Sequence, residues 1–475
     1  MKPLVRKNIV NGEPRPIKIL QFGTGNFLRG FTDWMVDRMN ENSGFNADIQ
    51  MVQVHNRKPA RGINEQEGLY HVLIRGYQNG KTVETNRLIQ CVRGAINPYL
   101  DYSQYLDLGL NPDLQFIFSN TTEAGIYFEE NDKDWTIAPD SFPAKLTALL
   151  YRRFEHFHGD SAKGLIILPC ELIEDNGDKL KKIILRYVEL WNLPGTFEDW
   201  LVKHNVFCNT LVDRIVPGYP MESAKAIQES LGYQDEQMVM AEPFHFWAIQ
   251  GPEWLGDVFP TKNSNLDVRV VRDLAPFRTR KVRILNGGHT ALVPFAYLKG
   301  QRFVREAVED TETGEFLQKA IFEEIIPSMD LAREELIPFA NDVLDRFKNP
   351  FIKHQLKDIA LNSISKFKVR VLPSILEFIN KEGRVPNNLA KSFAALIVFY
   401  RGYYNGFETP IKDKQEIIDY FNGLWKIKEP EGLVADVLSK IDFWEQDLNL
   451  VQGLSTAVIA EIKNLLASET IKRKP

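Results

Sequence analysis

The sequence has little cysteine and no long apolar run. Its three cysteines, Cys91, Cys170 and Cys208, lie far apart and form no CxxC pair. This spacing argues against a disulfide scaffold and a cysteine-type zinc site, and it favours a reducing compartment. The longest purely apolar stretch, Phe393 to Tyr400, is far too short to cross a membrane, and no apolar run follows the first basic residues. We therefore expect a cytoplasmic protein without a signal peptide or a membrane span.

Neither sign of charge predominates. The 475 residues include 58 Lys and Arg against 63 Asp and Glu, a formal net charge of −5, so nothing draws the whole protein toward nucleic acid or an anionic membrane. The eight histidines contain no HxxxH or HExxH pair, and we expect no metal site. With 44% hydrophobic and 11% aromatic residues, the chain can bury a large core, and its length fits two domains or three.

The first half alternates short apolar segments with helical patterns. The apolar segments are Ile17–Phe22, Ile49–Val54, Leu114–Ser119 and Leu165–Leu168. The helical patterns are Phe27–Asn40, Pro143–Phe157 and Lys179–Leu190. Such alternation is typical of a parallel sheet covered on both faces. It predicts a Rossmann-type, doubly wound α/β domain over residues 1–275.

After about Pro276, apolar residues recur at three- and four-residue spacing and strand-like runs become scarce. The expected helices are Arg283–Lys299, Glu315–Ile326, Ile352–Ser365, Leu389–Tyr404, Lys414–Trp425, Glu431–Lys440 and Thr456–Leu466. The second half is therefore predicted to be an all-α domain over residues 276–475.

A glycine turn, QFGTGNFLRG, joins the first predicted strand to the first predicted helix. Gly23 and Gly25 would permit the tight turn and close backbone approach that a pyrophosphate needs, and free N–H groups at the helix start would face its charge. We predict that Gly23, Gly25, Asn26 and Phe27 bind a dinucleotide. The spacing departs from GxGxxG, so a glycine-rich turn without a ligand is the alternative.

The segment after the second predicted strand leaves the choice of dinucleotide open. It lacks the acidic residue that usually binds the adenosine ribose, and it carries Arg57 and Lys58 instead. These two cations could meet the 2′-phosphate of NADP, or they could be ordinary exposed residues.

A second cluster begins the helical half, in RKVRILNGGHT. On an α-helix Asn286 and His289 share a face, and Lys281 lies near its edge. Lysine can protonate a developing alkoxide, an asparagine amide can donate to that oxygen, and histidine can orient hydroxyl groups. The alternative is a surface helix with a stray histidine.

Upstream, Asn209 precedes a buried-looking Val-Asp-Arg sequence. Asp213 and Arg214 are interpreted as an internal ion pair rather than as catalytic groups.

Together, QFGTGNFLRGF, NTLVDRIVPG and the K-x4-N-x2-H cluster resemble the mannitol dehydrogenase family of long-chain polyol dehydrogenases. FSNTTEAGI, LPCELIEDNG, LNGGHTALVPFAYL and RFKNPFIKHQL resemble its keto-uronate-reducing branch, the tagaturonate reductases. The resemblance implies a metal-independent enzyme that reduces tagaturonate to altronate with NADH. It implies Lys281 as the general acid/base, Asn209 and Asn286 as the oxyanion hole, and His289 as a substrate-positioning residue. Arg278 stands where some polyol relatives carry a carboxylate.

A keto-uronate has a carboxylate about 5 Å from its ketone, at the far end of the extended chain. A site for it needs a cation there, whereas a polyol site does not. We predict that His354, Lys366 and Arg370 include the groups that bind this carboxylate; a solvated basic helix face is the alternative.

Other functions stay open at this point. Fructuronate reductase and neutral polyol dehydrogenase are alternatives within the family, and a catalytically silent dinucleotide-binding protein is an alternative outside it. The residues do not indicate the oligomeric state.

Overall fold

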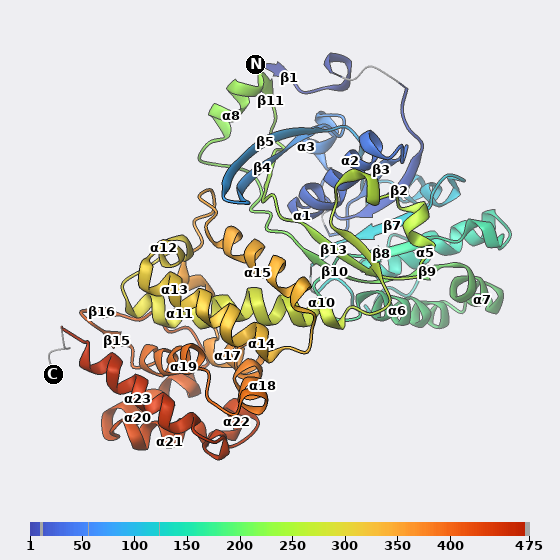
Figure 1. Cartoon of the computed structure of the whole chain (residues 1–475). Helices are drawn as coiled ribbons and strands as arrows, with labels where there is room; N and C mark the ends of the chain where they lie inside the picture. Colours follow the sequence, from blue (N-terminus) through green and yellow to red (C-terminus); the bar gives the residue numbers. More distant parts are fainter. Residues whose placement is uncertain (10–12, 56, 123, 471–475) are drawn as a thin grey trace. The chain divides into compact units, whose positions relative to one another are not determined.

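The computed structural model describes residues 1–9, 13–55, 57–122 and 124–470, and it divides into two compact units (Figure 1). Unit 1 comprises Met1–Arg75 and Val83–Leu274, and unit 2 comprises Gly76–Thr82 and Ala275–Pro475.

Unit 1 is built on a six-stranded parallel sheet (Figure 1). From edge to edge its strands are β6 (Val92–Ile96), β3 (Asp48–Val52), β2 (Ile17–Phe22), β7 (Phe116–Ser119), β8 (Ile166–Pro169) and β9 (Val206–Phe207). Numbered along the chain, this order is 3-2-1-4-5-6, the order of the Rossmann fold. The predicted doubly wound domain is confirmed, and β2 has the predicted bounds.

Apolar side chains alternate between the two faces of this sheet, as the pleat of a strand requires. On β2, Ile19 packs on one face, and Leu20 and Phe22 pack on the other. The face of Leu20 is covered by the helices α5 (Phe142–His156), α6 (Asn176–Leu190) and α7 (Gly195–His204).

The opposite face is covered differently from the prediction. Helix α2 (Trp34–Asn42) packs there together with a second, three-stranded sheet. Its strands are β10 (Asn209–Asp213), β13 (Phe246–Gln250) and β14 (Val268–Val271). These strands were not predicted, because β10 and β13 are buried along most of their length and show no clear polar–apolar alternation.

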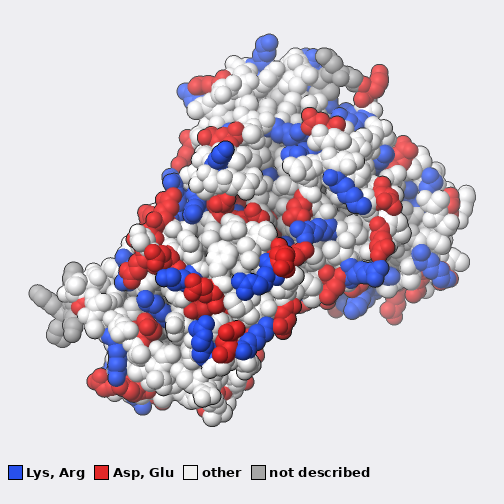
Figure 2. All heavy atoms as spheres, viewed as in Figure 1, with Lys and Arg blue, Asp and Glu red and all other residues white. Residues whose placement is uncertain are grey.

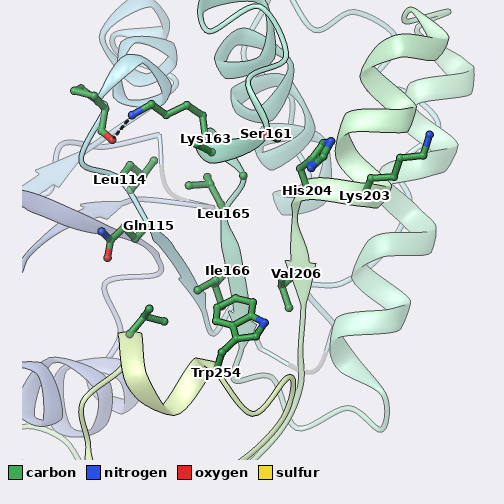
Figure 3. A pocket seen from close by; sticks show the side chains of 14 residues that line it. Leu114, Gln115, Ser161, Lys163, Leu165, Ile166, Lys203, His204, Val206 and Trp254 are labelled. Carbon is green, nitrogen blue, oxygen red and sulfur yellow. Dashed lines mark hydrogen bonds between the residues drawn. The ribbon is translucent and has the colours of Figure 1, made fainter.

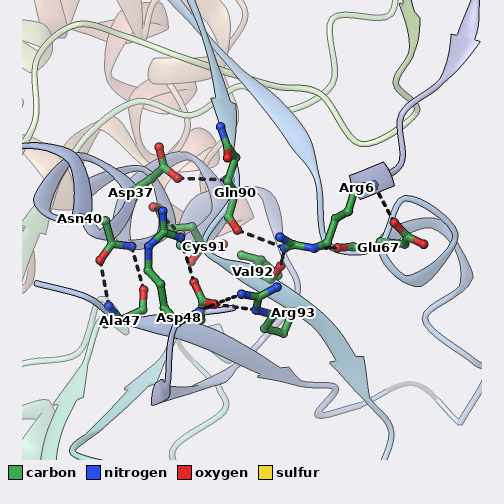
Figure 4. Close-up of polar contacts among 12 residues, drawn as sticks. Arg6, Asp37, Asn40, Ala47, Asp48, Glu67, Gln90, Cys91, Val92 and Arg93 are labelled. Carbon is green, nitrogen blue, oxygen red and sulfur yellow. Dashed lines mark hydrogen bonds and ion pairs between the residues drawn. The ribbon is translucent and has the colours of Figure 1, made fainter. Parts of the chain in front are cut away.

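A buried carboxylate at the start of β3 is neutralised by arginines. Asp48 accepts hydrogen bonds from Arg93 Nε at 2.5 Å and from Arg15 Nη1 at 3.2 Å. Figure 4 shows Asp48 with Arg93, and Arg6 nearby with Glu67 and the carbonyl of Gln90. Pairing of this kind is what allows a charge to remain inside a core.

Unit 2 is helical, as predicted. Its central helix runs from α10 (Ala275–Arg280) through a π turn (Lys281–Asn286) into α11 (Gly287–Leu298). Helix α11 packs against α19 (Asn387–Phe399), which in turn packs against α23 (Leu454–Ala467). Nearly every residue of α11 and α19 is buried, so these apolar helices form the core of the unit.

Some predicted helix bounds in unit 2 are wrong. The predicted helix Ile352–Ser365 is two helices, α16 (Leu356–Ile359) and α17 (Ser363–Arg370), because Asn362 between them has a left-handed φ of 53°. The predicted helix Leu389–Tyr404 ends at Phe399 and is followed by the short hairpin of β15 (Tyr403–Tyr404) and β16 (Phe407–Glu408). Helices α15 (Arg333–Phe347) and α18 (Leu372–Glu382) were not predicted.

Charges of both signs are interspersed on the surface that Figure 2 shows, as expected from the small net charge. Among the described residues, no helix combines the length and the apolar character that a membrane crossing requires.

Candidate active site

The glycine turn lies at the carboxyl end of β2, between the ends of its two neighbours. The amide of Gly23 donates to the carbonyl oxygen of Val52 in β3, and the amide of Asn120, just after β7, donates to the carbonyl of Phe22. Gly23 has a φ of +124°, and an added Cβ would lie 3.0 Å from the Asn120 carbonyl oxygen. Only glycine fits this position without strain.

Gly25 has a different role from Gly23. It caps the first helical residues, α1 (Asn26–Leu28), without any side-chain hydrogen bond, and no described atom lies within 4 Å of where its Cβ would be. The space beside Gly25 is therefore open, and the N–H groups at the helix start adjoin it. Asn26 accepts a hydrogen bond from Arg29 Nη2 at 2.7 Å, and Phe27 stacks on Phe31 with 4.9 Å between ring centroids.

A π turn (Arg29–Asp33) follows this helix start. Asp33 is fully buried there and accepts hydrogen bonds from Tyr70 Oη at 2.6 Å and from Gln21 Nε2 at 3.4 Å. Burial raises the pKa of Asp33 to about 7, although these hydrogen bonds act in the opposite direction. Gln21 also donates to the carbonyl of Gly23, so a chain of hydrogen bonds joins the Asp33 carboxyl group to the glycine turn.

Arg214 contacts the π turn that follows the helix start. Its buried guanidinium donates to the carbonyl of Gly30 at 2.8 Å and to that of Glu242 at 2.7 Å. Burial lowers the pKa of Arg214 to about 9. Arg214, at the end of the NTLVDR segment, thus stabilises the helix that follows the glycine turn by donating hydrogen bonds to main-chain carbonyls.

The residues of this edge fit a bound dinucleotide. The turn lies at the carboxyl edge of the parallel sheet, where the strand order reverses between β3 and β7 on either side of β2. The open space at Gly25 and the N–H groups of the helix start suit a pyrophosphate.

Asn209, the predicted second oxyanion donor, lies in β10 of unit 1. Its amide nitrogen donates to Asp178 Oδ2 at 2.9 Å and to Gln250 Oε1 at 3.4 Å, and its oxygen accepts from the Asp178 amide. In this position Asn209 caps the first turn of α6.

The central helix of unit 2 carries Lys281, Asn286 and His289. The amide of Gly287 donates to the carbonyl of Val282, five residues back, which marks the π turn. A turn of this kind places side chains five residues apart nearly one above the other. Lys281 therefore shares the face of Asn286 and His289 instead of lying at its edge, a difference that the α-helical pattern could not predict.

His289 is enclosed by aromatic and cationic groups. Its ring stacks on Phe347, with 3.9 Å between centroids, and meets the ring of His354 edge-on at 5.0 Å. Burial, reinforced by the neighbouring His354 ring and by the positive charges of Arg346 and Arg370, holds the pKa of His289 well below its usual value. Its buried Nε2 atom has no hydrogen-bond partner among the described residues, so it is available to a ligand.

The three residues predicted to bind a carboxylate occupy different surroundings. His354 contacts His289, and Arg370 Nη1 lies 3.4 Å from the hydroxyl of Thr290, the next residue of the helix. Lys366 donates to the carbonyl of Ile359 at 2.8 Å. Arg346, which is buried and close enough to influence His289, was not among the residues predicted for this site, although it begins the segment RFKNPFIKHQL.

A pocket of about 540 Å³ lies elsewhere in unit 1 (Figure 3). Gln115, Ile166 and Val206 place it at the amino ends of β7, β8 and β9, the sheet edge opposite the glycine turn. It is therefore separate from the glycine turn. Among the described parts of the chain, no three His, Cys, Asp or Glu side chains are grouped so that they could hold a metal ion.

Two family models match nearly the whole chain. The mannitol dehydrogenase Rossmann domain matches residues 17–259, and the mannitol dehydrogenase C-terminal domain matches residues 273–466. The chain belongs to the mannitol dehydrogenase family. The fold described above, a Rossmann-type sheet followed by helices, is the fold of this family.

Several curated members of the family are similar over almost their full length. The altronate oxidoreductase of Yersinia enterocolitica is 45% identical over 96% of both chains. That of Bacillus subtilis is 42% identical over 95% of this chain and 93% of its own, and that of Escherichia coli is 44% identical over 98% of both.

Two solved structures have a similar fold. D-sorbitol dehydrogenase in substrate-free form matches with a TM-score of 0.79 and 23% identity, covering 95% of this chain and 93% of that one. Mannitol 2-dehydrogenase of Pseudomonas fluorescens, solved with NAD and D-mannitol, matches with a TM-score of 0.60 and 20% identity, over 96% and 92%.

The two glycines of the turn allow a discriminating test. Gly25→Ala should leave the melting temperature unchanged, because its Cβ meets no protein atom, yet weaken dinucleotide binding about tenfold or more by filling the cradle. Gly23→Ala should lower both the melting temperature and the affinity. Calorimetric titration and thermal unfolding check this, with Gly195→Ala, another site with an open Cβ position, as the control. Unchanged affinity in Gly25→Ala would place the dinucleotide elsewhere.

Proposed function

We propose that this protein catalyses the reversible, NADH-dependent reduction of the ketone of D-tagaturonate to D-altronate. The relatives called altronate oxidoreductase, similar over the whole chain, support this substrate. The glycine turn and the Rossmann sheet support a dinucleotide cofactor, and the mannitol dehydrogenase solved with NAD supports its identity.

One observation carries the choice of a sugar acid over a neutral polyol. Arg346, Arg370 and His354 lie around His289, directly beside the turn that presents Lys281 and Asn286. A carboxylate would be attracted by the positive charges of Arg346 and Arg370 and could accept hydrogen bonds from a guanidinium, whereas a neutral polyol would gain no such charge pairing.

The chemistry follows from the types of these groups. Bound NADH supplies the hydride that the ketone carbon receives. Lys281, as the ammonium form, gives a proton to the ketone oxygen, and the Asn286 amide donates a hydrogen bond to that oxygen as its negative charge develops. His289, held neutral by burial, accepts from or donates to a substrate hydroxyl through its otherwise unpaired Nε2 atom.

In the proposed reaction, Asn209 is the second residue that donates a hydrogen bond to the ketone oxygen. Its amide N–H groups bond to Asp178 and Gln250, so it must leave one of them to reach a substrate oxygen. We place the reaction in the cytoplasm, where the three buried free thiols, Cys91, Cys170 and Cys208, would stay reduced.

The direct test is the initial rate of NADH oxidation with tagaturonate, fructuronate and fructose, measured side by side with a chelator present. We expect clear preference for tagaturonate and no loss of rate with the chelator. Preference for fructuronate would indicate that the enzyme reduces fructuronate instead, at the same site. Activity on fructose alone would contradict a carboxylate site.

Replacement of the proton donor should affect turnover far more than binding. Lys281→Met should lower kcat by about 10²- to 10⁴-fold, because no other group described at this site gives the proton, and should leave dinucleotide affinity unchanged. Lys299→Met, an exposed lysine at the end of the same helix, is the matched control. Near-normal turnover in Lys281→Met would refute the role.

The carboxylate-binding groups should determine the KM for the keto-acid. Arg370→Met should raise the KM for tagaturonate about 10- to 100-fold, the usual cost of a lost charge-assisted hydrogen bond. Lys368→Met on the same helix, where the lysine pairs with Glu445, should not. If Arg370→Met leaves the KM unchanged, the carboxylate binds elsewhere.

The pH dependence provides a second measurement of the same site. Burial lowers the pKa of His354, so its ring is neutral in the free enzyme at pH 7. A bound carboxylate favours the protonated ring, and binding therefore takes up a proton. The KM for tagaturonate should fall as the pH decreases below about 6.5, the usual pKa of histidine, and His354→Gln should abolish this dependence.

A further inference from the structure

The loop after β3 contains a contact that the sequence could not indicate. In a Rossmann fold the end of the second strand lies beside the adenosine ribose, and a carboxylate there binds the 2′-hydroxyl of NAD. Here β3 is the second strand of the sheet, and its last residue, Val52, bonds to Gly23 of the glycine turn. The residues that follow carry Arg57 and Lys58 and no acid.

A carboxylate reaches this place from another part of the chain. Arg57 Nη2 lies 2.7 Å from Asp140 Oδ1, although 83 residues separate the two in sequence. The Arg57 guanidinium also lies over the ring of Tyr99, 4.5 Å from its centroid. Both side chains of the pair are more than half exposed, so a ligand at the end of β3 can contact them.

The backbone around Asp140 is held from several sides. The buried Asp132 carboxylate accepts hydrogen bonds from the amides of Asp140 and Ser141, and Ser141 caps α5. Lys145 donates to the carbonyl of Asp140 at 2.8 Å and to the hydroxyl of Tyr99 at 2.9 Å. Asp140 therefore stands in a fixed position, not on a loose loop.

Resting on the function proposed above, we propose that Asp140 is the residue that selects NADH over NADPH, by supplying the carboxylate that the loop after β3 lacks and by pairing with Arg57. The pair leaves no uncompensated charge for a 2′-phosphate at Arg57. The carboxylate repels that phosphate and can accept a hydrogen bond from a free 2′-hydroxyl. The Tyr99 ring, which lies against the Arg57 guanidinium, holds that group in position for its pairing with Asp140.

The test measures binding in the absence of sugar substrate, by calorimetric titration of the full-length protein with NADH and with NADPH. Wild type should prefer NADH. Asp140→Asn should tighten NADPH binding about tenfold or more, because Arg57 then faces the 2′-phosphate alone, and should change NADH binding much less. The double variant Arg57→Gln, Asp140→Asn should lose this gain.

The control is Asp113→Asn, which changes the net charge by the same amount at the amino end of β7, and which should leave both affinities as in wild type. The proposal is overturned if Asp140→Asn leaves the ratio of the two affinities unchanged, or if the gain for NADPH persists in the double variant. Because binding is measured without sugar, a failure of this proposal can be distinguished from a failure of the proposed tagaturonate reduction.

Discussion

The arrangement of the candidate catalytic groups depends on one added residue in a buried helix. In the central helix of unit 2, the hydrogen bond from Gly287 to Val282 spans five residues instead of four. A turn widened in this way is less stable than an α-helical turn and is common at functional sites. Here it rotates Lys281 onto the face of Asn286 and His289. The helix that carries it is enclosed by other helices, so the widened turn is held by its surroundings.

Sequence patterns predicted the parts of the structure that depend on short-range periodicity. Both ends of strand β2 were predicted correctly, because its apolar segment begins directly after Pro16 and ends directly before Gly23. Helix α17 was misjudged, since the apolar spacing continues through Asn362 while its left-handed backbone breaks the helix. The strands β10 and β13 escaped prediction because burial on both sides removes alternation.

The same distinction applies to the site. The glycine turn and the Lys281 cluster are local in sequence, and their residue types point to their chemistry. Contacts that join distant segments were not accessible: the pairing of Arg57 with Asp140 and the approach of Arg346 to His289 follow from the tertiary fold alone. The π turn was also inaccessible, because no residue pattern in RKVRILNGGHT distinguishes it from an α-helix.

The absence of a side chain at Gly287 has a consequence for substrate length. A Cβ there would lie 2.9 Å from the carbonyl oxygen of Arg370, so the end of α17 rests against the backbone of the central helix. The separation between the backbone of the turn that carries Lys281 and that of the Arg370 segment is thus determined by two main chains in contact, which cannot adjust as flexible side chains do. Under the proposed function, only the side chains of Lys281 and Arg370 could then adjust to a sugar acid one carbon longer or shorter, so such an acid should bind less well.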